Sequence, residues 1–343
     1  MLGSIGVTLI MIEILLRVAI AFNLGGLRNA DLFYNSLSDD NYWKYRLIWS
    51  DYEETVMRTL QPDFGWLPPT SPTNPHGIVL SDAEKSKPID TSGPAVLFYG
   101  DSYVQALTPP ADAIPQQMDL LLPDENVYNL GVSGFGIGQI YLRLRQTSAD
   151  FEDPTLLFGM LSFDLDRTVL NVRSAPKPRV SFDADGQLQV ANTPFNQDVE
   201  AWMADHPPRT LSFLWALINR TTNLIQSANN GSAFGHETRV DEKIAVNGQI
   251  MDHVANFAAE NNQPLIFVTF YSLSEFENDS WRETFFDEMC KKHDCINTQP
   301  ALTAQAQAQN RPVSDFYLAD GLHLNAEGNK IVAQYIVSEM EKR

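Results

Sequence analysis

Ala95-Val96-Leu97-Phe98-Tyr99-Gly100-Asp101-Ser102 joins an apolar run to a short polar turn. Residues 95–99 have the composition of a buried parallel strand, and residues 103–107 can begin a helix. Open α/β folds place their sites at the carboxyl edge of the sheet, where such a strand ends. The sequence therefore predicts that Ser102 stands at that edge. Its own N–H then lies at a helix N-terminus, where it could stabilise a developing oxyanion.

Gly-Asp-Ser alone also fits an ordinary turn and helix N-cap, but two further motifs agree with a reactive serine. Residues 129–136 read Asn-Leu-Gly-Val-Ser-Gly-Phe-Gly, and residues 320–325 read Asp-Gly-Leu-His-Leu-Asn. A serine hydroxyl is a poor nucleophile until a base takes its proton, and His323 is the candidate base. Asp320, three residues earlier, is close enough to hold the imidazole and stabilise its charged form.

In this order the three motifs resemble those of the GDSL, or SGNH, hydrolase superfamily, over roughly residues 90 to 340. The resemblance implies a flavodoxin-like three-layer α/β/α fold with a central parallel sheet. It implies a Ser102–His323–Asp320 triad that hydrolyses acyl esters through an acyl-enzyme intermediate. It also implies an oxyanion hole that includes the N–H groups of Ser102 and Gly134.

The third family motif departs from the pattern. Family members often carry Gly-x-Asn-Asp after the third strand, and here the matching stretch is Met160-Leu161-Ser162-Phe163-Asp164. Phe163 stands where the asparagine would donate to the oxyanion, and loss of one such donor typically costs about 10²–10³ in kcat. Another donor, such as Ser162 or a polar group from an insertion, could replace it. The enzyme could also work with two backbone donors, or the protein could be slow or inactive.

Alternating strands and helices organise the chain after residue 94. Strands are expected at 95–101, 126–132, 155–161 and 264–270, with a short fifth at 295–300. Helices are expected at 137–146, 209–228 and 240–261, and a terminal helix begins at the N-cap Asn325. An insertion over about 167–240 contains a predicted hairpin with Asp185-Gly186 at its turn. This insertion could be a lid over the site or a surface elaboration.

Residues 2–22 form the most apolar stretch, long enough for one membrane crossing. Glu13 and Arg17 interrupt it, and each would cost about 2.5–3.5 kcal/mol near a bilayer centre. They are four apart, so on a helix they share a face and can pair. We expect an uncleaved N-terminal hydrophobic helix over 1–24 that anchors the chain in a membrane, and the alternative is a helix packed on the domain. We expect residues 25–94 to be a proline-rich segment that wraps over the domain, and residues 95–343 to form the hydrolase domain.

The composition of the chain excludes some classes of binding partner. It has 343 residues, of which 44% are hydrophobic and 20% are charged, an ordinary composition for a globular protein. Its net charge is −19. The acidic balance argues against nucleic-acid binding. The two cysteines, Cys290 and Cys295, lack the spacing of a structural zinc site, so they are either a disulfide or two free thiols. No metal or other cofactor is implied.

The sequence therefore predicts a serine esterase that acts on an acetyl or short-chain ester, with an acetylated glycan or a lipid as a candidate substrate. Its catalytic domain would be periplasmic or extracellular. One alternative is an O-acyltransferase that passes the acyl group to an envelope polysaccharide. Another is a degenerate domain of the same fold that binds a glycan or protein, which Phe163 favours and which the retained Ser102, Asp320 and His323 argue against.

Overall fold

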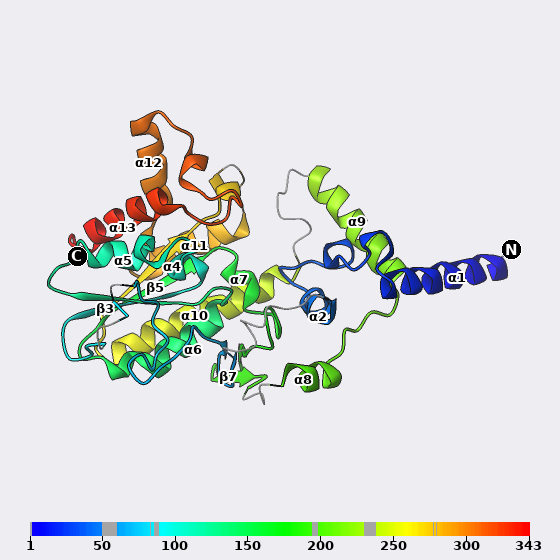
Figure 1. The fold of residues 1–343 in the computed structure, drawn as a ribbon, viewed down its shortest axis with the longest axis horizontal. Coiled ribbons are helices and arrows are strands. Elements are labelled where there is room, and N and C mark those ends of the chain that lie inside the picture. The colour runs from blue at the N-terminus through cyan, green and yellow to red at the C-terminus, as the bar shows by residue number, and fades with distance from the viewer. Residues whose placement is uncertain are drawn as a thin grey trace. The chain divides into compact units, whose positions relative to one another are not determined.

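The computed structural model describes residues 2–49, 60–82, 84–85, 89–193, 198–229, 238–276, 278 and 280–343 (Figure 1). Parts of the predicted segments 25–94 and 167–240 lie outside these ranges. The chain divides into two compact units, one of residues 1–66, 170–177 and 192–239 and the other of residues 67–169, 178–191 and 240–343. The domain boundaries expected from the sequence stay a prediction.

The second unit is built on a five-stranded parallel sheet in the order β4-β3-β5-β8-β9. Its strands are β3 (Ala95–Gly100), β4 (Asn126–Gly131), β5 (Thr155–Leu161), β8 (Leu265–Phe270) and β9 (Cys295–Asn297). Counted along the chain, the order is 2-1-3-4-5, the flavodoxin-like arrangement, whose switch point lies between the first and third of these strands. The predicted fold class is confirmed.

Helices cover both faces of this sheet (Figure 1). One face carries α6 (Ile137–Thr147) and α10 (Val240–Glu260), with α11 (Trp281–Lys292) beside α10. The other carries α4 (Ser102–Gln105), α5 (Ile114–Asp119), α12 (Gln299–Gln309) and α13 (Ala326–Met340). Short elements complete the unit: α7 (Asp164–Arg167), a hairpin of β6 (Arg179–Phe182) and β7 (Leu188–Ala191), and the 3₁₀ turns η3 (Pro110–Asp112), η4 (Ser148–Asp150), η5 (Leu273–Phe276) and η6 (Val313–Phe316).

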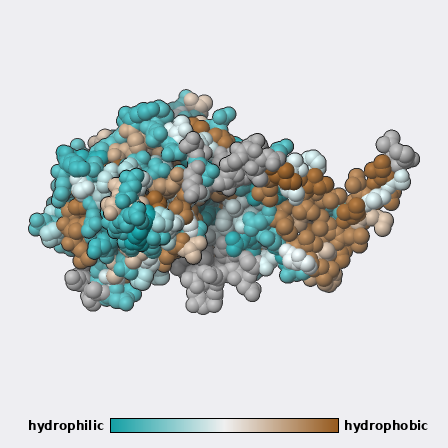
Figure 2. Space-filling model, turned by 90° about the horizontal axis from the view of Figure 1, so that it is seen from above, coloured by the Kyte–Doolittle hydropathy of each residue, from teal (hydrophilic) through white to brown (hydrophobic). Residues whose placement is uncertain are grey.

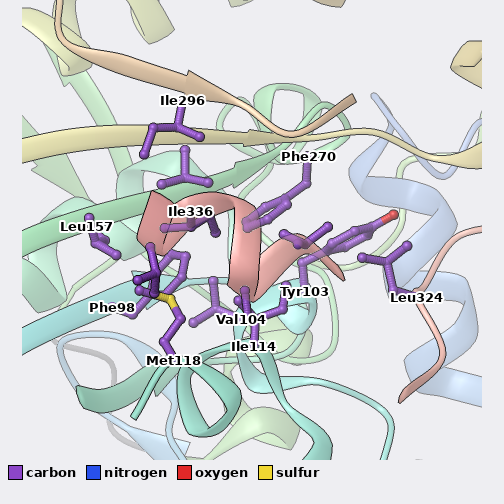
Figure 3. Packing of buried hydrophobic residues seen from close by; sticks show 14 of the residues in the cluster. Phe98, Tyr103, Val104, Ile114, Met118, Leu157, Phe270, Ile296, Leu324 and Ile336 are labelled. Atoms are coloured by element: carbon purple, nitrogen blue, oxygen red, sulfur yellow. The ribbon is translucent and has the colours of Figure 1, made fainter. Parts of the chain in front are cut away.

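Strand β3 is buried along its whole length, as its unbroken apolar sequence predicts for a central parallel strand. Phe98 and Val104 are fully buried in the cluster between the sheet and the α4, α5 and α13 layer. Figure 3 shows Tyr103 between Phe270 and Leu324 in this cluster, and the rings of Tyr103 and Phe270 stack with centroids 5.1 Å apart. The residue that follows the nucleophile candidate is thus part of the core.

Most predicted elements agree with the structure to within a few residues, and one differs in kind. The expected fifth strand over 295–300 ends at Asn297, and Gln299 begins α12 with Pro300 in its first turn. A proline fits the first turn of a helix because the N–H that it lacks has no partner there. The hairpin is confirmed, with Gly186 at positive φ in its turn, and so is the N-cap Asn325, which accepts a hydrogen bond from the N–H of Gly328.

The first unit is mainly helical. It contains α1 (Leu2–Ala21), α2 (Asp40–Trp49), α8 (Val199–Asp205) and α9 (Phe213–Asn229), two short 3₁₀ turns, η1 (Leu24–Gly26) and η2 (Ala30–Leu32), and a small ladder of β1 (Leu60–Gln61) and β2 (Gly65–Trp66). The window Ser4–Ala21 of α1 has the length and apolar composition of a membrane span and is only 6% buried within the structure. Helix α1 therefore exposes apolar side chains rather than packing as a core helix.

Candidate active site

Ser102 stands where β3 ends and the one-turn helix α4 begins, as its sequence predicts. Asp101 is the N-cap of α4 and accepts a hydrogen bond of 2.8 Å from the N–H of Tyr103. The serine is 4% exposed. Its Oγ lies 2.9 Å from Nε2 of His323 and 3.1 Å from Oδ2 of Asp101. The hydroxyl therefore has two acceptors within reach.

Asp320 and His323 lie together in the loop before α13. Oδ2 of Asp320 is 2.6 Å from Nδ1 of His323, and Oδ1 accepts from the N–H groups of Leu322 and His323. Burial would raise the pKa of Asp320, but the hydrogen bonds from the His323 ring and from these two N–H groups outweigh it and lower that pKa. An ionised Asp320 accepts a hydrogen bond from the Nδ1–H of His323, which keeps that proton on Nδ1 and leaves the Nε2 lone pair facing Ser102.

The structure thus brings together the three residues named from motifs that are more than 200 positions apart in sequence. The hydrogen-bonded chain runs from Ser102 through His323 to Asp320. Each of the three side chains lies within hydrogen-bonding distance of the next. The reason is that the carboxyl ends of parallel strands lie at one edge of the sheet, and the loop before α13 reaches that edge. Chemically, this arrangement can remove a proton from a hydroxyl and stabilise the imidazolium that results.

The glycine turn after β4 lies beside the serine turn, since Gly100 pairs with Gly131 across the two parallel strands. Gly134 has a φ of 85°, in the left-handed region that favours glycine. Gly131 is needed for a different reason. A Cβ at this position would lie 2.2 Å from the backbone N of Gln105 in α4. The close approach of the two turns therefore depends on the absence of a side chain at Gly131.

Phe163 follows β5 and has no hydrogen to donate. Its side chain packs against the core cluster, and the Arg282 guanidinium lies 5.3 Å from its ring centroid. The neighbouring Ser162 donates its single hydroxyl hydrogen to Glu275 over 2.6 Å. The Ser162 hydroxyl, which the sequence suggests as a replacement donor, is therefore engaged with Glu275 in this structure.

A buried charge cluster lies directly behind Ser102, and sequence reasoning missed it. Nη1 of Arg167 donates to Oδ2 of Asp101 and to the carbonyl oxygen of Phe135, each over 2.9 Å, and to Oδ1 of Asp164. One guanidinium thereby joins the serine turn, the glycine turn and the third motif. The signal in the sequence is the Asp164 and Arg167 pair at a spacing of three, immediately after a buried strand.

The pKa values of the two carboxyls in this cluster are shifted in opposite directions. Burial favours the neutral form of both. At Asp101 the Arg167 charge and the hydrogen bond from Tyr103 outweigh burial, so its pKa is lowered. At Asp164 burial and the negative charge of Asp101 raise the pKa well above its ordinary value. Of the two carboxyls, Asp101, beside the nucleophile candidate, is thus the one whose ionised form the cluster favours.

The short helix α7, which carries Arg167, is itself held by buried charges. Asp166 binds Lys243 of α10 over 2.5 Å and Arg282 of α11 over 2.7 Å, and all three side chains are at most 1% exposed. Asp166 is costly to remove, because Lys243 and Arg282 would both be left buried without their counter-ion. The position of Arg167 is therefore supported by two neighbouring helices.

Glu275 connects the loops that follow β5 and β8. Its Oε2 accepts from Ser162 Oγ and from the N–H of Ser272 over 2.8 Å. In the same loop, Leu273 donates its N–H to the carbonyl of Gly321, two residues before His323. Burial raises the pKa of Glu275, although hydrogen bonds from the two serines oppose the rise. Glu275 therefore holds the loop that follows β8, and this loop is in turn hydrogen-bonded to the loop that carries His323.

No group of three or more histidine, cysteine, aspartate or glutamate side chains is arranged to hold a metal ion among the described residues. Cys290 and Cys295, left open by the sequence, form a disulfide that joins the last turn of α11 to the start of β9.

No family model and no curated protein sequence matches the chain significantly. Among solved structures, it is similar to a member of the lipolytic G-D-S-L family from Veillonella parvula, with 10% identity, a TM-score of 0.40, and coverage of 71% of this chain and 97% of the other. A lipase/acylhydrolase from Enterococcus faecalis aligns with 13% identity, a TM-score of 0.40, and coverage of 73% and 96%.

A two-domain esterase active on acetylated mannans aligns with 11% identity and a TM-score of 0.41, over 74% of this chain and 50% of the esterase. Solved structures of lipolytic G-D-S-L proteins are thus among those that this chain is similar to.

Proposed function

We propose that the protein is a serine esterase of the SGNH type. The observation that carries the proposal is the hydrogen-bonded chain from Ser102 Oγ through the His323 ring to Asp320. Ser102 attacks the acyl carbon while His323 takes its proton, and Asp320 stabilises the imidazolium. His323 then gives the proton to the leaving alkoxide. Water, activated by the same histidine, releases the acid from the acyl-enzyme.

The tetrahedral intermediate carries its negative charge on the former carbonyl oxygen. The N–H of Ser102, at the start of α4, and the N–H of Gly134 are the proposed donors to it. Phe163 supplies none. With two backbone donors in place of three, we expect a lower kcat than a side-chain donor would allow, by about 10²–10³.

We propose further that α1 anchors the protein in a membrane. Support comes from the span-like window Ser4–Ala21, with mean hydropathy 2.1 and little burial. The Cys290–Cys295 disulfide supports an oxidising compartment for the catalytic unit, because disulfides persist mainly outside the cytosol. A periplasmic or extracellular ester is the substrate class that fits this location.

A fluorophosphonate probe tests the nucleophile, because such probes react only with an activated serine. The full-length protein in detergent is labelled beside Ser102→Ala and a matched control, Ser92→Ala, which removes an exposed hydroxyl bonded to Asp90. We expect labelling of the wild type and of Ser92→Ala, and none of Ser102→Ala. A folded wild type that takes no label would contradict the proposal and favour a binding domain.

A product assay then separates hydrolysis from transfer. With an aryl acetate as donor, release of acetate whose rate is unchanged by added oligosaccharide supports the esterase. Acetylated oligosaccharide as the main product would replace the proposal with an acyltransferase that uses the same acyl-enzyme.

A further inference from the structure

The two charged residues of α1 are both bound to the segment that leads into α9. Glu13 accepts hydrogen bonds from the N–H groups of Phe213 and Leu214, over 3.1 and 3.0 Å, and from Ser212 Oγ over 2.9 Å. These N–H groups belong to the first turn of α9 and have no partner within the helix. Glu13 is therefore an N-terminal cap supplied by another helix, and its negative charge suits that end of the helix dipole.

Arg17 completes the same junction. Its Nε lies 2.7 Å from Glu13, and its Nη2 donates to the carbonyl oxygens of Thr210 and Leu211 over 3.3 and 3.1 Å. The charges that interrupt the apolar sequence of α1 are thus compensated by the backbone at the start of α9. Helices α1 and α9 form one structural element, in which α9 meets α1 with its N-terminal end (Figure 1).

An apolar stripe follows the outward face of α9 and begins just before the helix. Its members are Leu211, which precedes α9, and Trp215, Ile218 and Ile225 of α9, which are 99%, 68%, 49% and 57% exposed. The inward face of α9 packs against other residues of the unit. There the ring of Phe213 makes an edge-to-face contact with the ring of Phe33, with centroids 5.3 Å apart. Packing within the unit therefore explains the inward face, while the stripe remains in solvent unless something covers it. Contiguous exposed apolar surface of this kind marks an interaction site.

A groove of ≈ 480 Å³ runs between the stripe and α1. Its apolar walls come from both helices, and the Glu13–Arg17 pair lies in the same lining. The apolar residues of the lining are Leu9, Ile10, Ile14, Leu214, Trp215 and Ile218. Figure 2 shows apolar surface gathered over the part of the molecule that holds α1 and α9. The stripe is therefore continuous with the surface of the proposed anchor.

We propose that α9 is a second membrane-contacting helix, with its stripe in the bilayer interface and a phospholipid acyl chain in the groove beside α1. The inference rests on the proposed anchoring by α1. An amphipathic helix that lies in the interface buries an apolar face beside the acyl chains and keeps polar residues outward, and Trp215 is a residue type enriched at that level. The turns of α1 before Glu13 enter the hydrocarbon, and the Glu13–Arg17 pair lies at the boundary.

Depth-dependent quenching tests this arrangement in the full-length protein. Single cysteines at Leu9, Ile218 and Asn219 are labelled with a nitrobenzoxadiazole dye, with Cys290 and Cys295 left paired, and the protein is reconstituted into phosphatidylethanolamine–phosphatidylglycerol vesicles. Quenchers are doxyl lipids labelled near the headgroup or deep in the chain. We expect strong quenching of the Leu9 label, and quenching of the Ile218 label by the shallow doxyl that is several-fold stronger than that of the Asn219 label.

Asn219 is the matched control because it is the next residue of the same helix and is exposed on the flank of the stripe. Quenching at Leu9 with equal, weak quenching at Ile218 and Asn219 would overturn the inference and leave the anchor in place. Absence of quenching at all three sites would overturn the anchor and the inference together. Ready formation of disulfide-linked dimers by Ile218→Cys in vesicles, without lipid quenching, would show that a second copy covers the stripe instead.

A charge substitution provides the second measurement. Ile218→Asp, compared with Asn219→Asp, places a carboxylate on the stripe or beside it, with α1 unchanged in both. We expect the first to weaken several-fold the quenching of a dye at Ile225 by the shallow doxyl lipid, and the second to leave that quenching unchanged. Equal quenching in two folded variants would contradict the inference.

Discussion

Arg167 donates to the oxygen of Asp101 that also lies 3.1 Å from Ser102 Oγ. The serine hydroxyl has one hydrogen and two acceptors, His323 and Asp101. Only donation to His323 leads to reaction. Because Arg167 compensates the charge on Asp101, it weakens the competing acceptor and leaves the hydroxyl directed to His323. The guanidinium also holds the carbonyl of Phe135, next to Gly134. We therefore treat Arg167 as a positioning residue.

Substitution of Arg167 tests this role. Arg167→Ala leaves Asp101 buried without its partner, and we expect a loss of about 3–5 kcal/mol in the free energy of unfolding. Arg167→Lys keeps the charge, but its shorter side chain cannot place the ammonium at the position of Nη1, which makes all three contacts. We therefore expect a folded protein whose fluorophosphonate labelling is at least several-fold slower. Arg145→Ala on the exposed side of α6 is the control. Wild-type labelling by Arg167→Lys would contradict a positioning role.

Asp320→Asn removes the charge that holds the His323 ring. The amide can turn its N–H toward Nδ1 and select the wrong tautomer, which in serine proteases lowers kcat by about 10⁴. We expect a comparably large loss of labelling and of ester hydrolysis. The effect on stability is expected to be small, because the Asp320 side chain is 42% exposed and exposed charge pairs contribute about 0–1 kcal/mol. Thermal unfolding beside the kinetics separates the two effects.

Gly131→Ala tests the close approach of the two turns. The added Cβ would lie 2.2 Å from the backbone N of Gln105, so α4 and Ser102 must shift. We expect a loss of about 1–3 kcal/mol in stability and slower labelling. Gly248→Ala in α10 is the matched control, because its Cβ meets nothing within 4 Å. An alanine in a helix interior should raise stability by up to about 1 kcal/mol. Equal labelling by both variants would contradict the argument.

Phe163→Asn places an amide where the family motif has its third oxyanion donor. We expect kcat to rise, with a gain of about 10²–10³ as the upper bound for one donor. The melting temperature should fall, because the ring contact with Arg282 is lost. Phe163→Leu shares that loss without adding a donor. If the Phe163→Asn variant hydrolyses a short-chain ester no faster than the Phe163→Leu variant, a missing oxyanion donor does not limit the rate.

Glu275 gives a pH dependence of stability whose sign follows from burial. Its pKa in the folded protein is raised above the ordinary value of 4.5, so folding favours the protonated form. The stabilisation is present below 4.5 and is lost as pH rises from there through the folded pKa. Glu275→Gln removes this titration while it keeps an acceptor for Ser162 and Ser272. Unfolding free energies measured from acidic to neutral pH should fall less steeply in the variant than in the wild type, and parallel curves would contradict the assignment.

Local patterns were sufficient for the sheet and for the residues of the proposed triad. The apolar runs that became β3, β5 and β8 are buried on both faces, so they read clearly as parallel strands. Ser102 and the Asp320–His323 pair lie immediately after a strand and before the terminal helix. Parallel topology then brings such positions to one edge. The predicted end of the fifth strand, at residue 300, was wrong. The strand ends at Asn297, because helix α12 begins at Gln299 with a proline in its first turn.

The charge cluster behind the serine could not be predicted in this way. The spacing of Asp164 and Arg167 is visible in the sequence. The contact of Arg167 with Asp101 spans 66 positions and exists only because β3 and β5 are neighbours. The partners of Glu13 at the start of α9 are about 200 positions away, so the sequence alone showed only an expensive charge in an apolar helix.

The strands of the sheet, several of the helices and the chemical groups at the sheet edge could be predicted from the sequence, because strand burial, helix capping and turn formation depend on neighbouring residues. The folded chain was needed to show which acceptors Ser102 faces, what compensates Asp101 and where the charges of α1 are satisfied. These are buried electrostatic contacts, whose energy depends on distances between elements far apart in the chain, and no local pattern specifies them.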